Sequence, residues 1–139
     1  MDKLNLDFDY ELTKEYRYKY ESQCTCAYCR NYYKSFKVNY PKTSKLLEEF
    51  GLDANFPLEA MPLEYDKLND EMEYIVYYPI KGSMVEKKHV FLLENLEIKI
   101  FKGSNSGNPC PNPKMEEPYL LMELAQVKLL WVLEEELEQ

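Results

Sequence analysis

The stretch YLLMELAQVKLLWVL, residues 119–133, decides how the chain folds, because its apolar residues suit either a helix or a strand. In a helix of about 100° per residue, Gln126 and Lys128 would lie about 160° apart and would form no common polar face. In a strand, alternate residues share a face, and this pattern groups Leu121, Ala125, Val127, Leu129, Trp131 and Leu133. We therefore predict a strand with two largely apolar faces, central in its sheet, with Trp131 buried on it.

Glu123 interrupts the apolar face of this predicted strand. A carboxylate among apolar side chains has three explanations. Glu123 would pair with a lysine or a tyrosine, or it would mark an exposed position at a β-bulge. Otherwise the strand would have a different register from the one assumed.

The N-terminal residues carry the clearest alternation in the chain. Apolar residues occupy every second position over residues 4–12 and again over 16–20, with charged or polar residues between them. This period of two predicts half-exposed strands of an antiparallel sheet. Lys14 falls on the apolar positions, which indicates two strands, or one long strand that bends there.

The next segment has helical periodicity. Cys29, Tyr32, Tyr33 and Phe36 follow the i, i+3, i+4, i+7 spacing of one helix face, which predicts a helix over 26–38 with Thr25 as its N-cap. Pro41 ends that pattern, and a second short helix is expected to begin at Thr43 or Ser44. Its apolar stripe is Leu46, Leu47 and Phe50, and Gly51 stands where a left-handed C-terminal residue belongs.

The second half of the chain returns to β structure. Residues 53–72 are expected to form a connector, and 74–80 a strand that ends at Lys81-Gly82-Ser83. Residues 90–101 are also strand-like, and 102–118, with two glycines and four prolines, are expected to form a long loop. Together these segments predict one α+β domain over 1–139. It has an antiparallel sheet of four to six strands from both chain ends, with one or two helices, about residues 26–52, packed against it.

Composition narrows the classes of protein. The 139 residues are 45% hydrophobic and 30% charged, with a net charge of −8, which is typical of a folded soluble domain. No apolar run is long enough to cross a membrane, and the first residues lack the pattern of a signal peptide, so a cytoplasmic location without membrane attachment is expected. The net negative charge disfavours attraction to nucleic acid.

The four cysteines carry the strongest chemical signal. Cys24, Cys26 and Cys29 form a C-x-C-x-x-C motif, and three close thiolates are natural ligands for a tetrahedral zinc ion. A fourth ligand would come from Cys110, or from His89, the single histidine. The predicted metal ligands are therefore Cys24, Cys26, Cys29 and Cys110.

Two other interpretations of the cysteines stay open. In the first, Cys29 would pack on the buried face of its helix, Cys24 and Cys26 would occupy the preceding turn, and no cofactor would be bound. Alternatively, Cys26 and Cys29 form a redox C-x-x-C pair, with thiol pKa values lowered by the helix N-terminus and Arg30.

Residues 22–47 contain five basic residues, several aromatic residues and no acid. Cations beside aromatic rings suit the binding of nucleic acid, but the helix would bury Tyr32, Tyr33 and Phe36, so a solvated basic face is the preferred interpretation. The sequence contains no glycine-rich phosphate loop and no convincing pair of catalytic carboxylates, and no catalytic residue is predicted.

Three segments resemble those of a group of uncharacterised small acidic proteins from low-GC Gram-positive bacteria. They are Cys24-x-Cys26-x-x-Cys29-Arg30-Asn31-Tyr32, Leu47-Glu48-Glu49-Phe50-Gly51-Leu52-Asp53 and Leu130-Trp131-Val132-Leu133-Glu134. The resemblance implies a bacterial cytoplasmic protein and transfers no activity or site residue to this chain.

The sequence therefore favours a small non-catalytic interaction or accessory module. Its 13 tyrosines are more than a core of this size needs, and tyrosine is enriched where proteins meet, so a protein partner or a homodimer is expected. A zinc-stabilised module and a thiol-redox protein are the alternatives.

Overall fold

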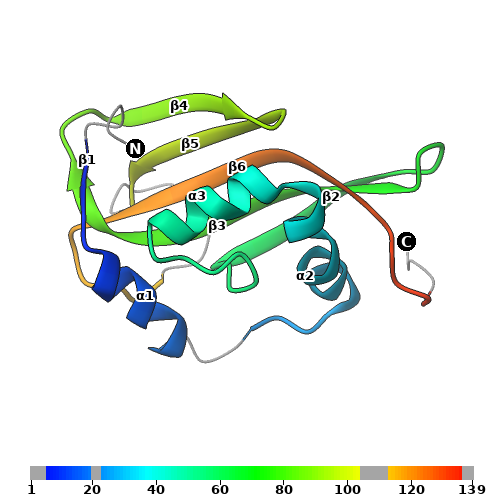
Figure 1. The fold of residues 1–139 in the computed structure, drawn as a ribbon, viewed down its shortest axis with the longest axis horizontal. Coiled ribbons are helices and arrows are strands. Elements are labelled where there is room, and N and C mark those ends of the chain that lie inside the picture. Colours follow the sequence, from blue (N-terminus) through cyan, green and yellow to red (C-terminus); the bar gives the residue numbers. More distant parts are fainter. Residues whose placement is uncertain (1–5, 20–22, 104–112, 136–139) are drawn as a thin grey trace.

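The computed structural model describes residues 6–19, 23–103 and 113–135, and within them three helices lie against one six-stranded sheet (Figure 1). The elements are β1 (Leu6–Phe8), α1 (Tyr10–Lys19), α2 (Ala27–Asn39), α3 (Pro41–Glu49), β2 (Glu59–Asp66), β3 (Glu71–Met84), β4 (Lys88–Leu93), β5 (Leu96–Lys102) and β6 (Tyr119–Leu130). The strands pair antiparallel in the order β1-β3-β6-β5-β4, and β2 also pairs with β3. The predicted α+β class with an antiparallel sheet is confirmed.

The predicted central strand is confirmed as β6, which pairs with β3 on one side and β5 on the other. The grouping of its side chains is wrong. The pairing with β3 shifts at Gln126, where φ is +66°, so that β6 carries one extra residue in a β-bulge. Side chains before and after the bulge therefore exchange faces. The residues that face the helices are Leu120, Met122 and Leu124 before it, and Val127 and Leu129 after it.

The bulge explains the position of Glu123, which lies on the sheet face opposite the helices. The hydroxyl of Tyr77 donates a hydrogen bond to Glu123 Oε2 at 3.0 Å, and Lys99 Nζ lies 3.9 Å from Glu123 Oε1. The carboxylate is thus paired with a tyrosine and a lysine, and the strand also has a different register from the one assumed.

The long N-terminal strands predicted from alternation are wrong for the described residues. Only Leu6–Phe8 is a strand, and α1 follows from Tyr10. Asp9 explains the change, because its Oδ1 accepts a hydrogen bond from the Leu12 amide at 2.9 Å, as an N-cap residue does. Thr13, in the first turns, is buried and accepts a hydrogen bond from the Lys81 amide at 3.0 Å. Local capping and docking against β3 outweigh the period of two.

The two predicted helices are confirmed as α2 and α3, but their N-terminal caps differ from those predicted. Cys26, not Thr25, is the N-cap residue of α2. Helix α3 begins at Pro41 itself, and its first turn is capped from a distance. The Glu94 carboxylate accepts hydrogen bonds from the Thr43 amide at 2.6 Å and from the Thr43 hydroxyl at 2.8 Å.

None of the helices in the described part of the chain has the length and apolar character needed to span a membrane.

The remaining segments contain more strand than predicted. The connector expected over 53–72 includes β2, and β3 continues through Lys81-Gly82-Ser83 to Met84. The strand-like residues 90–101 form the hairpin of β4 and β5, which turns at Glu94 and Asn95 with φ values of +52° and +66°. Of the predicted loop 102–118, residues 104–112 lie outside the described part of the chain.

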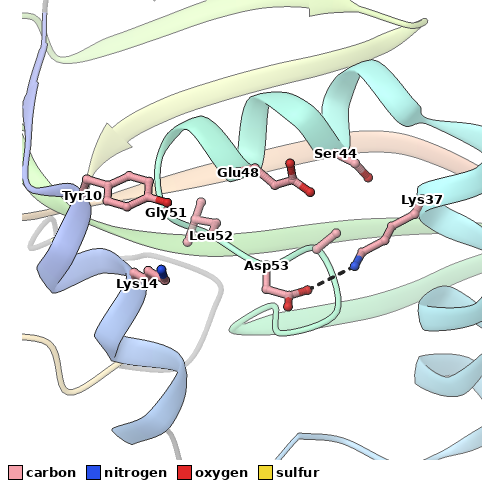
Figure 2. Close-up of a pocket in the computed structure, with 9 residues that line it drawn as sticks. Tyr10, Lys14, Lys37, Ser44, Glu48, Gly51, Leu52 and Asp53 are labelled. Atoms are coloured by element: carbon pink, nitrogen blue, oxygen red, sulfur yellow. Dashed lines mark ion pairs between the residues drawn. The ribbon is translucent and has the colours of Figure 1, made fainter.

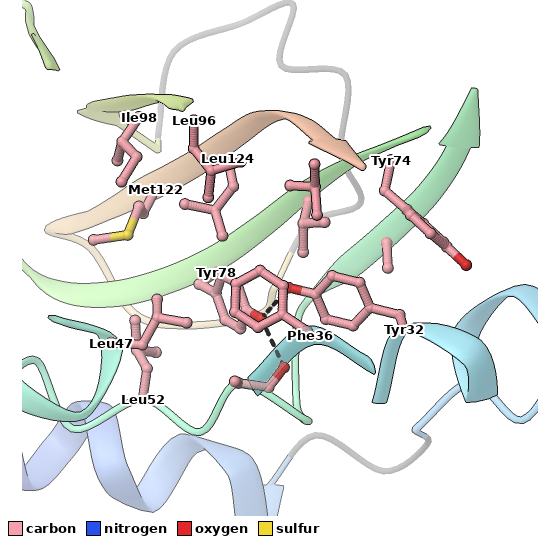
Figure 3. Close-up of a cluster of buried hydrophobic side chains, with 14 of the residues drawn as sticks. Tyr32, Phe36, Leu47, Leu52, Tyr74, Tyr78, Leu96, Ile98, Met122 and Leu124 are labelled. Carbon is pink, nitrogen blue, oxygen red and sulfur yellow. Dashed lines mark hydrogen bonds between the residues drawn. The ribbon is translucent and has the colours of Figure 1, made fainter. Parts of the chain in front are cut away.

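The main core lies between the sheet and helices α2 and α3 (Figure 3). Tyrosines bring polar atoms into this core, and hydrogen bonds satisfy them. The hydroxyls of Tyr32 and Tyr78 lie 2.7 Å apart, and the Tyr78 hydroxyl donates to the Ala54 carbonyl at 2.6 Å. Part of the tyrosine content is therefore structural and ties α2, the loop after α3 and the sheet together.

Replacement of Gly51 by alanine is expected to weaken the attachment of α1. Gly51 has φ of +91°, and a Cβ there would lie 2.6 Å from the Tyr10 carbonyl oxygen. The strained backbone alone costs about 1–3 kcal/mol, and the clash with α1 adds to this cost. Chemical denaturation should show that Gly51→Ala lowers the free energy of unfolding by about 1–3 kcal/mol or more. The exposed control Lys45→Ala should lower it by less than about 0.5 kcal/mol. An equal effect of the two variants would contradict the close packing.

Candidate metal centre

The C-x-C-x-x-C motif forms a compact cluster of sulfur atoms at the start of α2. The Sγ atoms of Cys24, Cys26 and Cys29 all lie within 4.8 Å of one another, and the sulfurs of Cys24 and Cys26 are 3.3 Å apart. Cys24 and Cys26 are exposed, whereas Cys29 is buried, and all three are free thiols. The structure thus brings together three of the four predicted ligands, which form a group able to hold a metal ion.

Two side chains of α2 fold the preceding segment back over the helix. The Tyr33 hydroxyl donates a hydrogen bond to the Cys24 carbonyl at 2.7 Å, and Arg30 Nε donates to the Thr25 carbonyl at 2.9 Å. Because Tyr33 and Arg30 stand on the first two turns of the helix, these bonds bring Cys24 close to Cys29. The cluster is therefore set by local geometry within residues 24–33.

The surroundings shift the acidities of Cys26 and Cys29 in opposite directions. Burial opposes ionisation of Cys26, but the backbone amides of Cys29 and Tyr28 and the neighbouring thiols together lower its pKa. Burial, followed by the proximity of the Cys24 and Cys26 sulfurs, raises the pKa of Cys29. Cys26 is thus the thiol of this pair that ionises first.

In the metal-free protein, alkylation should report this order. Only the thiolate reacts with iodoacetamide, so the rate of modification of Cys26 is expected to rise at a pH below the ordinary thiol pKa. The rate at Cys29 should rise only at a pH above it, since its pKa is shifted in the opposite sense. Peptide mass spectrometry after short exposures across a pH series measures both rates. Modification of Cys29 at a lower pH than Cys26 would contradict the assigned environments.

The segment after β6 packs beside the cysteine cluster. Asn31, fully buried on α2, accepts a hydrogen bond from the Val132 amide at 2.8 Å and donates one to the Leu130 carbonyl at 3.2 Å. Arg30 forms an ion pair with Glu135. These contacts place the end of the described chain against the first turns of α2.

Trp131 follows the end of β6 and is half-buried, so the prediction of a buried tryptophan on the strand is wrong. Its ring meets Tyr28 edge to face, with 5.9 Å between the centroids, and its Nε1 donates to the Glu135 carbonyl at 2.9 Å. No pattern in the sequence indicated the roles of Asn31 and Glu135 or this contact. An asparagine beside an apolar stripe gives no signal that it will bind a distant strand end.

The fourth predicted ligand is not placed by the structure. Cys110 lies outside the described residues. His89 stands on β4, with its Nε2 3.5 Å from Glu86 Oε2, and among the described residues no histidine or carboxylate joins the three sulfurs. In the basic segment Tyr32 and Phe36 are fully buried, so neither ring is available for a base to stack on.

Comparisons with known proteins give no relative: no family model, no curated protein and no solved structure matches the chain. The resemblance drawn from the sequence stays a prediction. The candidate site therefore stands on its own geometry and donor chemistry.

Proposed function

We propose that the protein is a small non-catalytic interaction module in which one zinc ion, bound by Cys24, Cys26 and Cys29, holds the N-terminus of α2 and the segment before it. The observation that carries this proposal is the separation of the three sulfurs, all within 4.8 Å of one another. Zinc–sulfur bonds of about 2.3 Å in a tetrahedron place ligand sulfurs about 3.8 Å apart. The observed separations, 3.3 Å between the sulfurs of Cys24 and Cys26 and at most 4.8 Å within the cluster, lie on either side of this spacing.

The donor set favours a structural role for the metal. Sulfur-rich sites are typical of structural zinc, and three thiolates more than neutralise the charge of a Zn²⁺ ion. Such an ion polarises a bound water or carbonyl weakly, so it contributes mainly by crosslinking the chain. Cys110 remains the proposed fourth ligand.

The surface around the cluster has the composition of a protein-binding patch. Tyr28 and Trp131 are half-buried and meet edge to face, and the exposed Arg30 pairs with Glu135, whose carbonyl accepts a hydrogen bond from the Trp131 indole. Aromatic residues and arginine are enriched at protein interfaces and dominate their binding energy. A metal that fixes residues 24–29 would also fix this patch, which supports a protein partner or a second copy of the chain as the ligand.

Thiol-redox chemistry is the second candidate, because the pKa of the exposed Cys26 is lowered and its sulfur lies 3.3 Å from that of Cys24. In such a reaction the Cys26 thiolate would attack a substrate disulfide, release one thiolate and form a mixed disulfide. A neighbouring thiol, Cys29 or Cys24, would lose its proton, attack the Cys26 sulfur and release the second substrate thiolate.

Cobalt titration separates the two candidates. Co²⁺ replaces zinc in thiolate sites and produces sulfur-to-cobalt charge-transfer absorption whose intensity grows with the number of thiolates. The reduced wild-type protein should bind one equivalent with a strong band, and Cys24→Ser, Cys26→Ser and Cys29→Ser should each weaken it. Cys110→Ser tests the fourth ligand in the same assay. Absence of the band in the wild type, with formation of an intramolecular disulfide on addition of glutathione disulfide, would reject the zinc module in favour of redox chemistry.

A further inference from the structure

A second feature, separate from the cysteine cluster, is a cavity between α1, the last turn of α2, α3 and the loop that follows α3 (Figure 2). Its volume is about 180 Å³. This is below the roughly 300–1,000 Å³ typical of pockets for drug-sized ligands, so it suits a small metabolite. The lining residues are Tyr10, Lys14, Lys37, Ser44, Glu48, Gly51, Leu52, Asp53 and Ala54.

Ser44 is the polar group that distinguishes this cavity from an ordinary surface hollow. Only 8% of the residue is exposed, and its hydroxyl makes no hydrogen bond within the described part of the protein. Buried hydroxyls are nearly always hydrogen-bonded in folded proteins, because an unpaired one costs free energy. A ligand with a hydrogen-bonding group beside Ser44 would satisfy it.

The charges around the cavity balance. Lys14 and Lys37 provide two positive charges, and Glu48 and Asp53 two negative ones. Lys37 Nζ already lies 3.6 Å from Asp53 Oδ1, whereas the structure shows no ion pair between Glu48 and any described side chain. A simple anion would be repelled by the two carboxylates and a simple cation by the two lysines. The balance favours a ligand that carries both charges.

The spacing of Ser44 and Glu48 matches such a ligand. The two residues are four apart on α3, so they are neighbours on one helix face, with about 5–6 Å between their Cβ atoms. Figure 2 shows both side chains above the loop, with Lys37 beyond Ser44 and Lys14 on the opposite wall. A hydroxyl donor and a carboxylate at this spacing suit a carboxylate and an ammonium group attached to the same carbon atom.

We propose that this cavity binds the zwitterion of a free α-amino acid. The ligand carboxylate accepts hydrogen bonds from the Ser44 hydroxyl and the Lys37 ammonium group, and the ligand ammonium group donates to the Glu48 carboxylate. Tyr10, Lys14 and Leu52 bound the space left for the amino-acid side chain. This binding site is independent of the cysteine cluster and of the function proposed for it.

The test is titration of ¹⁵N-labelled protein with the common L-amino acids in the millimolar range, followed by amide chemical shifts. At least one should shift the amides of Ser44, Glu48 and Gly51 in a saturable way. Its N-acetyl derivative lacks the ammonium group and its amide derivative lacks the carboxylate. Each should bind at least about tenfold more weakly, since each loses a charge-assisted hydrogen bond.

Matched variants test the residues. Glu48→Gln should weaken binding about tenfold or more, whereas Glu49→Gln, a neighbouring exposed position outside the cavity, should leave it unchanged. Ser44→Ala should weaken binding without lowering the melting temperature, because its hydroxyl makes no hydrogen bond to the described protein. The proposal is overturned if no amino acid shifts these amides, if the blocked derivatives bind equally well, or if Glu49→Gln matches Glu48→Gln.

Discussion

Replacement of Phe36 by alanine is expected to lower the free energy of unfolding by about 3–5 kcal/mol, the usual cost of deleting a buried aromatic side chain. Phe36, in the C-terminal half of α2, is fully buried. Its ring stacks on Tyr32 with centroids 4.8 Å apart and on Tyr40 at 5.3 Å. The variant therefore removes packing from both sides of the ring, and the neighbouring rings, held by hydrogen bonds of their own, cannot collapse into the space.

Urea denaturation measures this loss, and Val38→Ala is the matched control. Val38 lies on the same helix but is 79% exposed, so its replacement should change the free energy of unfolding by less than about 0.5 kcal/mol. A loss below about 1 kcal/mol for Phe36→Ala would mean that the aromatic stripe of α2 is not packed as described. The basic, aromatic segment would then again be a candidate for base stacking.

The second large effect is expected from zinc. A metal that binds only the folded chain stabilises it by about 4 kcal/mol when free zinc is about 1,000 times its dissociation constant. Thermal denaturation in buffered zinc should show this as a melting temperature that rises with zinc concentration, and a chelator should reverse it. The triple variant Cys24→Ser, Cys26→Ser, Cys29→Ser should melt at the same temperature with and without zinc. A zinc response that persists in this variant would place the metal elsewhere.

Where local rules decide the structure, the sequence predicted it well. Helix α2 and its buried Cys29, Tyr32 and Phe36 follow from the helical spacing alone, although Tyr33, predicted to be buried with them, is only half-buried. Gly51 takes the left-handed conformation expected after α3. The three cysteines could be predicted to converge because they are close in sequence at the start of one helix.

Long-range contacts account for most of what the sequence did not predict. Glu94 caps α3 from the turn between β4 and β5, and Asn31 holds the chain after β6. The bulge at Gln126 reverses the faces of β6, and a period of two carries no sign of one extra residue. The cavity was missed for a related reason. Its walls come from α1, the last turn of α2, α3 and the loop after α3, and α1 itself was predicted to be strand.

The most direct test of the proposed metal centre is native mass spectrometry of the reduced protein after equilibration with zinc and removal of the excess. The account predicts one zinc ion per wild-type chain, lost on addition of chelator, and none in the triple serine variant. Wild-type protein that carries no zinc under these conditions, or a triple variant that retains the same zinc, would contradict it.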